Sequence, residues 1–410
     1  MSESPCPNGS LPLEGLRVVD MGVSVAVPFA CLWLARMGAE VIYLESRRYN
    51  VRSAWPPFAD NVSGVNRAGT FNLLNAGKLS CTLDLSTPRG RELAREIIMV
   101  SDVVVENFSG GTMDKLGLGY DYLMKVRPDL IILSLSAFGR MGPMRDYVGY
   151  HSAVLLYSGL AAITGYRGGH PRILGSVFPD PVSGAYSVLA LLQALYNRYN
   201  TGQGQHIDLA MYEAMMTLMP QPIMDYTLNG REPSRVGNED AVKVPHGVYP
   251  CRHEDSWIAI SVGTEEEWRG LCEIIDHREW LSDSRFANKD SRRAHADELD
   301  AGIAQWTRRH TPYEAMELLQ KAGVLAGPTL DAGGILQDPH LRARDFVVET
   351  DHPEVGRRTI VGLPWLISKL PPANNDPAPL LGEHTERVLC DLLGVSHREV
   401  ERLIEEQVVY

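Results

Sequence analysis

The stretch LRVVDMGVSVAVPFACLWLARMGAEVIYLE, residues 16–45, decides the fold. Its outer parts, VVD at 18–20 and EVIYLE at 40–45, are short runs rich in β-branched residues, which are typical of strands. Between them, PFACLWLARMG carries apolar residues at helical spacing and ends on Gly38, a residue favoured just past a helix. A strand, a helix and a second strand in this order predict a β-α-β unit.

The same alternation continues along the N-terminal half. CTLDL at 81–85, VVVEN at 103–107 and LIILSLSAF at 130–138 predict further strands, and PRGRELAREIIMV at 88–100 predicts a helix. Strands separated by helices of this length imply a mostly parallel sheet that is covered on both faces.

Later parts of the chain follow other patterns. Residues 151–163 and about 181–199 are apolar at helical spacing and predict core helices. HGVYPCRHEDSWIAISVG, from His246, alternates like an antiparallel hairpin and precedes helical stretches rich in charge, which indicates a smaller α+β domain. Near the C-terminus, Gly394 and Ser396 are placed to end one amphipathic helix and to cap the next.

Composition excludes several classes of protein. The 410 residues are 44% hydrophobic and 22% charged, as in globular proteins, and exceed the roughly 250–300 residues at which single cores stop growing. A formal net charge of −12 without a basic run argues against a nucleic acid partner.

The six cysteines form no CxxC pair, so we expect neither a disulfide framework nor a metal site. Without a recognisable signal peptide or membrane span, we expect a cytoplasmic protein that does not bind membranes.

Familiar catalytic motifs do not occur. The first strand is followed by DMGVSVAVPF rather than GxGxxG, whose glycines allow the backbone to approach a pyrophosphate, so NAD or FAD binding is disfavoured. Walker A, HExxH and GxSxG sequences are also missing, which argues against a P-loop enzyme, a zinc peptidase and a nucleophile-elbow hydrolase.

Six other segments carry a resemblance to a known family. They are GAEVIYLES, CTLDLSTPRGRE, DVVVENFSGGTMDKLGLGY, LIILSLSAFGRMGP, DPVSGAYSVLALLQALYNRYNTGQGQHIDLAMYEAM and DPHLRARDFVVE, in this order. With this order and spacing, the chain resembles the class III CoA-transferases, which include formyl-CoA transferase and carnitine CoA-transferase. The resemblance covers nearly the whole chain.

The resemblance implies an architecture and a reaction. We expect a large Rossmann-like α/β domain at 1–225, a smaller α+β domain at 236–330 and a C-terminal segment at 340–410 that returns to the large domain. Family members form interlocked dimers, some from two different subunits, so we expect a homodimer or a heteromer with a related subunit. The reaction moves CoA from an acyl-CoA donor, such as succinyl-CoA, to a free carboxylic acid. Coenzyme A thioester is then a substrate, and no cofactor is permanently bound.

The family match implies that Asp180 is the catalytic nucleophile. In the family an acidic residue in a GDxxTG-like turn opens a helix, and here PDPVSG places Asp180, Ser183 and Gly184 in the matching positions. A carboxylate that attacks a thioester gives a mixed anhydride, from which the CoA thiolate forms an aspartyl-CoA thioester. On spacing alone, an Asp before a Pro is a helix N-cap. The two roles are compatible because a helix N-terminus stabilises a carboxylate.

The resemblance also implies residues that bind CoA at strand ends and in the following loops. Asn107 and Phe108 match positions that line the pantetheine and adenine region, and Lys115 matches a basic residue that faces the nucleotide phosphates. Without the match, Lys115 is equally well explained as a solvated helix residue and Arg47 as part of a surface loop. The remaining candidate substrate residues are Ser24, Val25, Arg47, Leu83, Thr112, Tyr150 and His151.

Departures from the family pattern bear on the substrate and on alternative reactions. Val25 stands where formyl-CoA transferase has a polar residue, and His151 replaces an acidic one, which favours a larger, less polar acid than formate or oxalate. His151 is either a general acid or base or a ligand of the acceptor carboxylate, or else a helix-start residue held by hydrogen bonds. Related 2-methylacyl-CoA racemases use a His and Asp pair, but His151 is displaced from that position by one residue, or about 100° on a helix. A racemase-like enzyme and a CoA-binding partner subunit are therefore the alternatives to the transferase.

Overall fold

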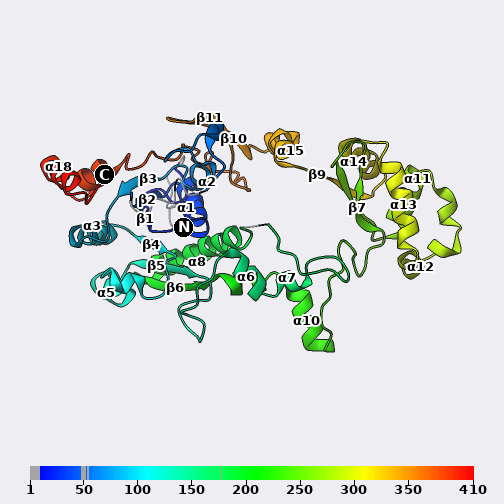
Figure 1. Ribbon diagram of the computed structural model, residues 1–410, viewed down its shortest axis with the longest axis horizontal. Coiled ribbons are helices and arrows are strands. Elements are labelled where there is room, and N and C mark those ends of the chain that lie inside the picture. The colour runs from blue at the N-terminus through cyan, green and yellow to red at the C-terminus, as the bar shows by residue number, and fades with distance from the viewer. Residues whose placement is uncertain (1–9, 48–51, 53–54, 176) are drawn as a thin grey trace, which may run out of the picture. The chain divides into compact units, whose positions relative to one another are not determined.

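The computed structural model describes residues 10–47, 52, 55–175 and 177–410 (Figure 1). The chain divides into two compact units. The described residues of Met1–Ala161, Ile173–Arg231 and Pro339–Tyr410 form the larger unit, and Ala162–Arg172 and Glu232–Asp338 form the smaller one. None of the described helices is long and apolar enough to cross a lipid bilayer.

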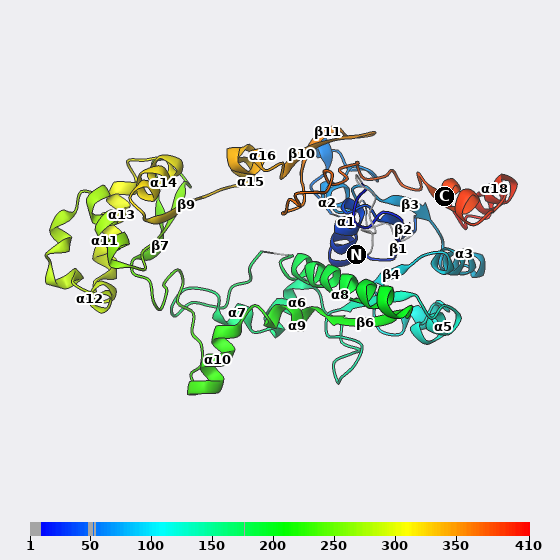
Figure 2. The ribbon, with the colours of Figure 1, turned by 180° about the vertical axis from the view of Figure 1, so that it is seen from behind.

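A six-stranded sheet forms the centre of the larger unit (Figures 1 and 2). Its order is β3-β2-β1-β4-β5-β6, the order of the doubly wound nucleotide-binding folds. Every neighbouring pair is parallel, which confirms the parallel sheet that the sequence predicts. The strands are β1 Arg17–Asp20, β2 Glu40–Glu45, β3 Leu79–Thr82, β4 Val103–Glu106, β5 Ile131–Ser136 and β6 Gln205–Ala210.

Successive strand residues enter two different cores. Val18 and Val103 face a core that contains residues of α1 and α8, whereas Val19 and Val104 face a core that contains residues of α3 and α18. Both faces are therefore buried, which explains why the strands are nearly continuous apolar runs.

The helices of the larger unit are α1 Ala26–Arg36, α2 Gly69–Leu74, α3 Pro88–Met99, α4 Thr112–Lys115, α5 Tyr120–Val126, α6 His151–Tyr157, α8 Pro179–Thr201, α9 Met211–Met216, α10 Pro220–Asn229, α16 Pro339–Ala343, α17 Thr385–Arg387 and α18 His397–Glu405, with a π-helical turn, η5, at Val388–Leu392.

The sequence predicts one helix at 151–163, but the structure contains two. The first is α6, and the second is α7, Leu160–Ile163. Gly159 separates them with φ of +87°, a left-handed conformation that an α-helix does not contain. The prediction of a continuous helix was wrong because the apolar spacing does not reveal this reversal.

Helices α1 and α8 pack at very short distance around one glycine. A Cβ atom on Gly184 would lie 2.9 Å from the Ala26 carbonyl oxygen and 2.8 Å from the Phe29 ring. Only glycine therefore fits at this crossing. The contact fixes the first turns of α8 against the start of α1.

The smaller unit contains an antiparallel sheet of order β7-β8-β9. The pairing of β7 with β8 confirms the hairpin predicted from His246 onward. Its core includes Ile258, Trp268, Leu271 and Trp306. The elements are β7 His246–Pro250, β8 Trp257–Ser261, α11 Glu265–Ile274, α12 Lys289–Ala294, α13 Ala296–Thr307, α14 Pro312–Lys321, β9 Leu325–Thr329 and α15 Ala332–Gln337.

The C-terminal segment packs along the edge of the parallel sheet at β3. Thr82 Oγ1 donates to the Tyr410 carbonyl oxygen at 2.7 Å, and the Asp84 N–H donates to the Val408 carbonyl at 2.8 Å. Figure 2 shows the C-terminus beside β3. Ser396 caps α18 through the Glu399 N–H, and Gly394 has φ of +72°, so both predicted helix signals are confirmed. This segment also contains the antiparallel pair β10 Val347–His352 and β11 Gly356–Val361.

A buried ion pair holds the end of β1. Lys78 Nζ lies 2.7 Å from Asp20 Oδ2 and also donates to the Pro28 carbonyl and to Asn75 Oδ1. The other oxygen of Asp20 accepts the Gly22 N–H at 2.8 Å. The charges are paired and hydrogen-bonded, the condition under which buried charges are tolerated.

We predict that Lys78→Met lowers the free energy of unfolding by about 3–5 kcal/mol, because it leaves the Asp20 carboxylate buried without its countercharge. Urea unfolding followed by circular dichroism measures the change. Lys125→Met, at an exposed position on α5, is the control and should change stability by less than about 0.5 kcal/mol. Equal effects of the two substitutions would contradict a structural role for the buried pair.

Candidate active site

The sheet order creates a crevice between the carboxyl ends of β1 and β4. In a doubly wound sheet the chain leaves these two neighbouring strands toward opposite sides, and ligands bind where the direction changes. A cavity of about 310 Å³ lies at this point. It is lined by Val23, Ser24, Asn107, Phe108, Tyr150, His151 and Asp180, together with residues of β5 and of the loop that follows it.

Side-chain hydrogen bonds fix the two loops that border the crevice. Asn107 Oδ1 accepts the Val23 N–H at 2.8 Å, and Asn107 Nδ2 donates to the Val23 carbonyl at 3.0 Å. The amide thus satisfies both backbone groups of Val23 across the crevice. Ser24, next in the chain, has φ of +66°, a conformation rare for residues other than glycine.

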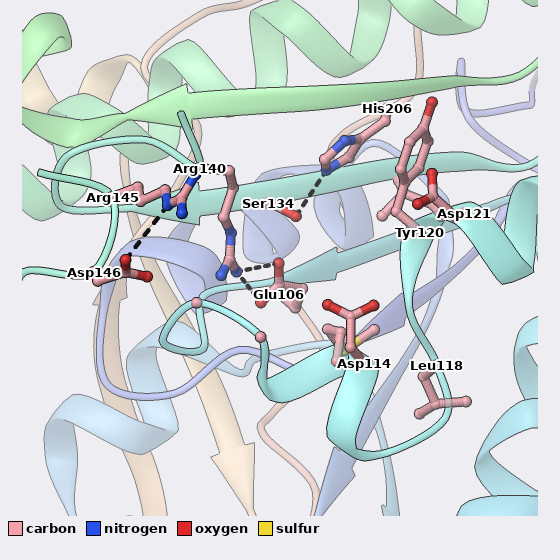
Figure 3. A pocket seen from close by; sticks show the side chains of 14 residues that line it. Glu106, Asp114, Leu118, Tyr120, Asp121, Ser134, Arg140, Arg145, Asp146 and His206 are labelled. Atoms are coloured by element: carbon pink, nitrogen blue, oxygen red, sulfur yellow. Dashed lines mark hydrogen bonds and ion pairs between the residues drawn. The ribbon is translucent and has the colours of Figure 1, made fainter. Parts of the chain in front are cut away.

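The second loop is held from its other side. Arg140 forms an ion pair with the buried Glu106 and donates to the Phe108 carbonyl at 3.0 Å, and Glu106 also accepts the Phe108 N–H. Figure 3 shows this pair in a further cavity of about 310 Å³, together with Ser134, His206 and Tyr120. Arg145 and Asp146 line both this cavity and the one that contains Asp180.

Asp180 lies in the first turn of α8 with only 7% of its surface exposed. Its Oδ2 atom accepts no hydrogen bond from any described residue. The nearest basic group is His151, whose Nδ1 lies 3.9 Å from Oδ2. Burial raises the pKa of Asp180 from its ordinary value near 3.8 to about 6, and the positive charge that His151 can carry opposes this shift.

The interpretation of Asp180 as a helix N-cap was wrong. Helix α8 begins one residue earlier, at Pro179, and its N-cap position is Phe178. Proline is favoured at the first helical position, and Pro179 takes that role before Pro181 can. The carboxylate of Asp180 is therefore not used to cap the helix.

A second cavity, of about 180 Å³, adjoins the first through Val23 and Phe108, which line both. Leu83, Glu45 and Ser46 also line it. The exposed Arg47 follows directly in the chain, with its guanidinium 5.8 Å from the centre of the Tyr410 ring. The two cavities together offer an elongated site along the carboxyl edge of the sheet.

Some candidate residues lie outside these cavities. Val25 precedes α1, Thr112 and Lys115 are the first and last residues of α4, and none of them lines either cavity. The sequence reasoning also missed residues that do line the first one. They include Phe138, Arg145, Asp146, Tyr147, Val148, Gly149 and Met211.

The loop GRMGPMRDYVG carried a usable signal for several of the missed residues. A Cβ atom on Gly149 would lie 2.7 Å from the Ala137 side chain and 2.9 Å from the Phe138 ring, so the loop must turn back closely onto the end of β5. A glycine that allows such an approach next to a strand end indicates a loop that contributes to the site.

Comparison with known proteins identifies the family. The sequence model of CoA-transferase family III matches residues 13–385. Succinyl-CoA–D-citramalate CoA-transferase of Chloroflexus aurantiacus is 32% identical, with 97% of this chain and 98% of that protein covered. Succinate–glutarate CoA-transferase of Agrobacterium fabrum is 34% identical, with 94% and 97% covered. Among solved structures, a CAIB/BAIF family protein from Brucella suis has a TM-score of 0.85 at 31% identity and covers 93% of this chain and 100% of its own. The resemblance found in the sequence is therefore confirmed, and the chain belongs to CoA-transferase family III and is an enzyme of that class.

Proposed function

We propose that the enzyme moves CoA from succinyl-CoA to a free carboxylic acid and that Asp180 is its covalent nucleophile. The observation that carries the proposal is the carboxylate of Asp180, which is buried at the wall of a cavity and has an oxygen without a hydrogen-bond partner among the described residues. The two relatives reported above are named for succinyl-CoA and succinate, which supports this donor.

The proposed reaction needs no other reagent. The Asp180 carboxylate attacks the thioester carbonyl, the C–S bond breaks, and an acyl-aspartyl anhydride and CoA thiolate result. The thiolate then attacks the Asp180 carbonyl, which releases the donor acid and leaves an aspartyl-CoA thioester. The acceptor carboxylate attacks this thioester, and the thiolate released attacks the acceptor carbonyl of the new anhydride. Acyl-CoA leaves and the Asp180 carboxylate is restored.

The surroundings of Asp180 favour this chemistry. A buried carboxylate with one oxygen that accepts no hydrogen bond from the described residues is poorly stabilised as an anion, which makes it more reactive toward a carbonyl carbon. Its position in the first turn of the 23-residue helix α8 places it near N–H groups that stabilise the negative oxygen formed during attack.

The cavities fit an extended CoA thioester. The adenine end of CoA would occupy the smaller cavity near Leu83 and Phe108, and the thioester would reach Asp180 in the larger one. Arg47 beside the smaller cavity and Arg145 at the rim of the larger one are basic groups available to the phosphates and carboxylates of the substrates.

The same cavity supports an acceptor with an apolar body. Phe138, Tyr147, Val148 and Tyr150 provide its aromatic and aliphatic lining, and His151 places an imidazole that can bind the acceptor carboxylate in the same cavity. The separation of 3.9 Å between His151 and Asp180 argues against a racemase, because a carbon between two bases needs about 3 Å to each.

We further propose that a second copy of the chain covers α8. Leu189, Leu192, Tyr196 and Tyr199 recur at helical spacing, and each is between 37% and 80% exposed. An apolar stripe of this length on one helix is typical of a protein interface.

The nucleophile is tested by mass spectrometry. After incubation with succinyl-CoA, the peptide that contains Asp180 should carry CoA, and Asp180→Ala should lose the adduct and at least about 10³-fold in kcat. Asp146→Asn changes an exposed carboxylate of the same cavity and is the matched control that should retain the adduct. A CoA adduct on another residue, or normal turnover by Asp180→Ala, would refute the proposal.

The pKa of Asp180 predicts the pH dependence. Only the carboxylate attacks, so kcat/KM for the acyl-CoA should rise with pH and level off above about 6. His151→Gln removes the neighbouring group whose positive charge lowers the pKa of Asp180, so this rise should move to higher pH. Initial rates measured between about pH 5 and 8 test both the rise and its displacement in His151→Gln. His170→Gln, at an exposed histidine, should leave the profile unchanged, and a shift to lower pH in His151→Gln would contradict the assignment.

The interface is tested by the molar mass in solution. Light scattering should show a homodimer, and Tyr196→Lys combined with Tyr199→Lys should shift it toward the monomer because two charges would be buried in the interface. Tyr122→Lys, at an exposed position on α5, is the control. A fully active monomer would exclude the dimer, whereas a chain that is active only with a related subunit would support the heteromer instead.

A further inference from the structure

The C-terminal segment brings a glutamate, a cysteine and a histidine together on the surface of the larger unit. The carboxylate of Glu386, the thiol of Cys390 and the imidazole of His397 each offer a ligand atom, and these atoms lie within 4.8 Å of one another. His397 Nδ1 lies 2.5 Å from Glu386 Oε1 and 3.8 Å from Cys390 Sγ. Within residues 10–47, 52, 55–175 and 177–410, this is the one place where three such side chains converge.

The backbone that carries these side chains is well anchored. Glu386 belongs to α17, Cys390 to the π-helical turn η5, and His397 is the first residue of α18. Val388 and Leu389 of the turn, and Val400 and Leu403 of α18, are buried in the core beneath. The three groups therefore meet on a fixed scaffold, as a ligand site requires.

The connection between the helices is also ordered. The Gly394 N–H donates to the Cys390 carbonyl, and the Val395 N–H donates to the Leu389 carbonyl. Ser396 then caps α18. These bonds hold the start of α18, and hence His397, directly against the turn that carries Cys390.

We propose that Glu386, Cys390 and His397 bind one zinc ion, with water as the fourth ligand. Thiolate, imidazole and carboxylate are the ligands that Zn²⁺ takes in proteins, and three protein ligands with one open position form a familiar zinc geometry. Bond lengths of about 2.0–2.3 Å in a tetrahedron place neighbouring ligand atoms roughly 3.3–3.7 Å apart. The sulfur–nitrogen separation of 3.8 Å already approaches this value, and the exposed Glu386 side chain is free to open its own contact.

The charges also fit a divalent cation. A thiolate and a carboxylate supply two negative charges, which balance Zn²⁺, and Asp391 adds a further negative charge next to Cys390. In the absence of metal, the group is an exposed histidine–glutamate contact of small energetic value, with the Cys390 thiol 3.8 Å from the same ring nitrogen. Participation of Cys390 therefore separates a metal site from a surface ion pair.

A bound ion would join η5 to α18, the elements next to the C-terminal residues that pair with β3. Because the ion binds only when both elements are in place, it would stabilise the folded C-terminal segment. This role is independent of the chemistry at Asp180, so the failure of one proposal leaves the other intact.

Cobalt provides the probe, because Co²⁺ substitutes for Zn²⁺ and absorbs light when a thiolate binds it. The full-length protein is first treated with a chelator and then titrated with Co²⁺ and afterwards with Zn²⁺. We expect a thiolate-to-cobalt charge-transfer band that saturates at one ion per chain and is abolished by Zn²⁺. Zn²⁺ should also raise the thermal unfolding midpoint.

Variants decide which residues bind the ion. Cys390→Ser should abolish the charge-transfer band, and Glu386→Gln and His397→Gln should each weaken Co²⁺ binding by roughly 10- to 100-fold or more. Glu405→Gln and His253→Gln change exposed residues outside the cluster and should bind Co²⁺ normally. The absence of the band in the wild-type protein, or its persistence in Cys390→Ser, would overturn the proposal. Equal unfolding midpoints of the metal-free proteins would show that the variants remain folded.

Discussion

The site depends on one constraint, the change of chain direction between β1 and β4. Two neighbouring parallel strands whose chains leave toward opposite sides cannot close their loops over each other, so a crevice remains at their carboxyl ends. The side chain of Asn107 spans this crevice and bonds both backbone groups of Val23. The sheet topology thus forms the crevice, and a single amide fixes its width beside the proposed nucleophile.

Two buried aspartates of the larger unit differ in how their charges are compensated. Asp20 is fully buried, but Lys78 and the Gly22 N–H satisfy both of its oxygens, so it stabilises the end of β1. Asp180 is nearly as buried, yet its Oδ2 accepts no hydrogen bond from the described residues and lies 3.9 Å from His151, and burial raises its pKa to about 6. A carboxylate that is compensated only in part lowers the stability of the fold, and such groups cluster at functional sites, which agrees with the role proposed for Asp180.

The candidate residues show where sequence reasoning reaches its limit. Ser24, Asn107, Phe108, Tyr150 and His151 come from three separate segments of the chain and lie with Asp180 around one cavity. Thr112 and Lys115 are close to Asn107 in sequence, but they are the first and last residues of α4 and line neither of the two cavities. Arg145 and Tyr147 were missed because a loop rich in glycine and proline has no periodicity that shows which side chains turn inward.

The sequence alone determined the β-α-β order, the parallel sheet, the hairpin of the smaller unit and the membership of CoA-transferase family III, because these follow from local periodicity and from motifs in a fixed order. Tertiary structure decided where α8 begins and how deeply Asp180 is buried. It also decided that Glu386, Cys390 and His397 meet and that Tyr410 pairs with Thr82 across more than three hundred residues. The physical reason is that burial, pKa and ligand geometry depend on atoms brought from distant parts of the chain, whereas a sequence pattern records only near neighbours.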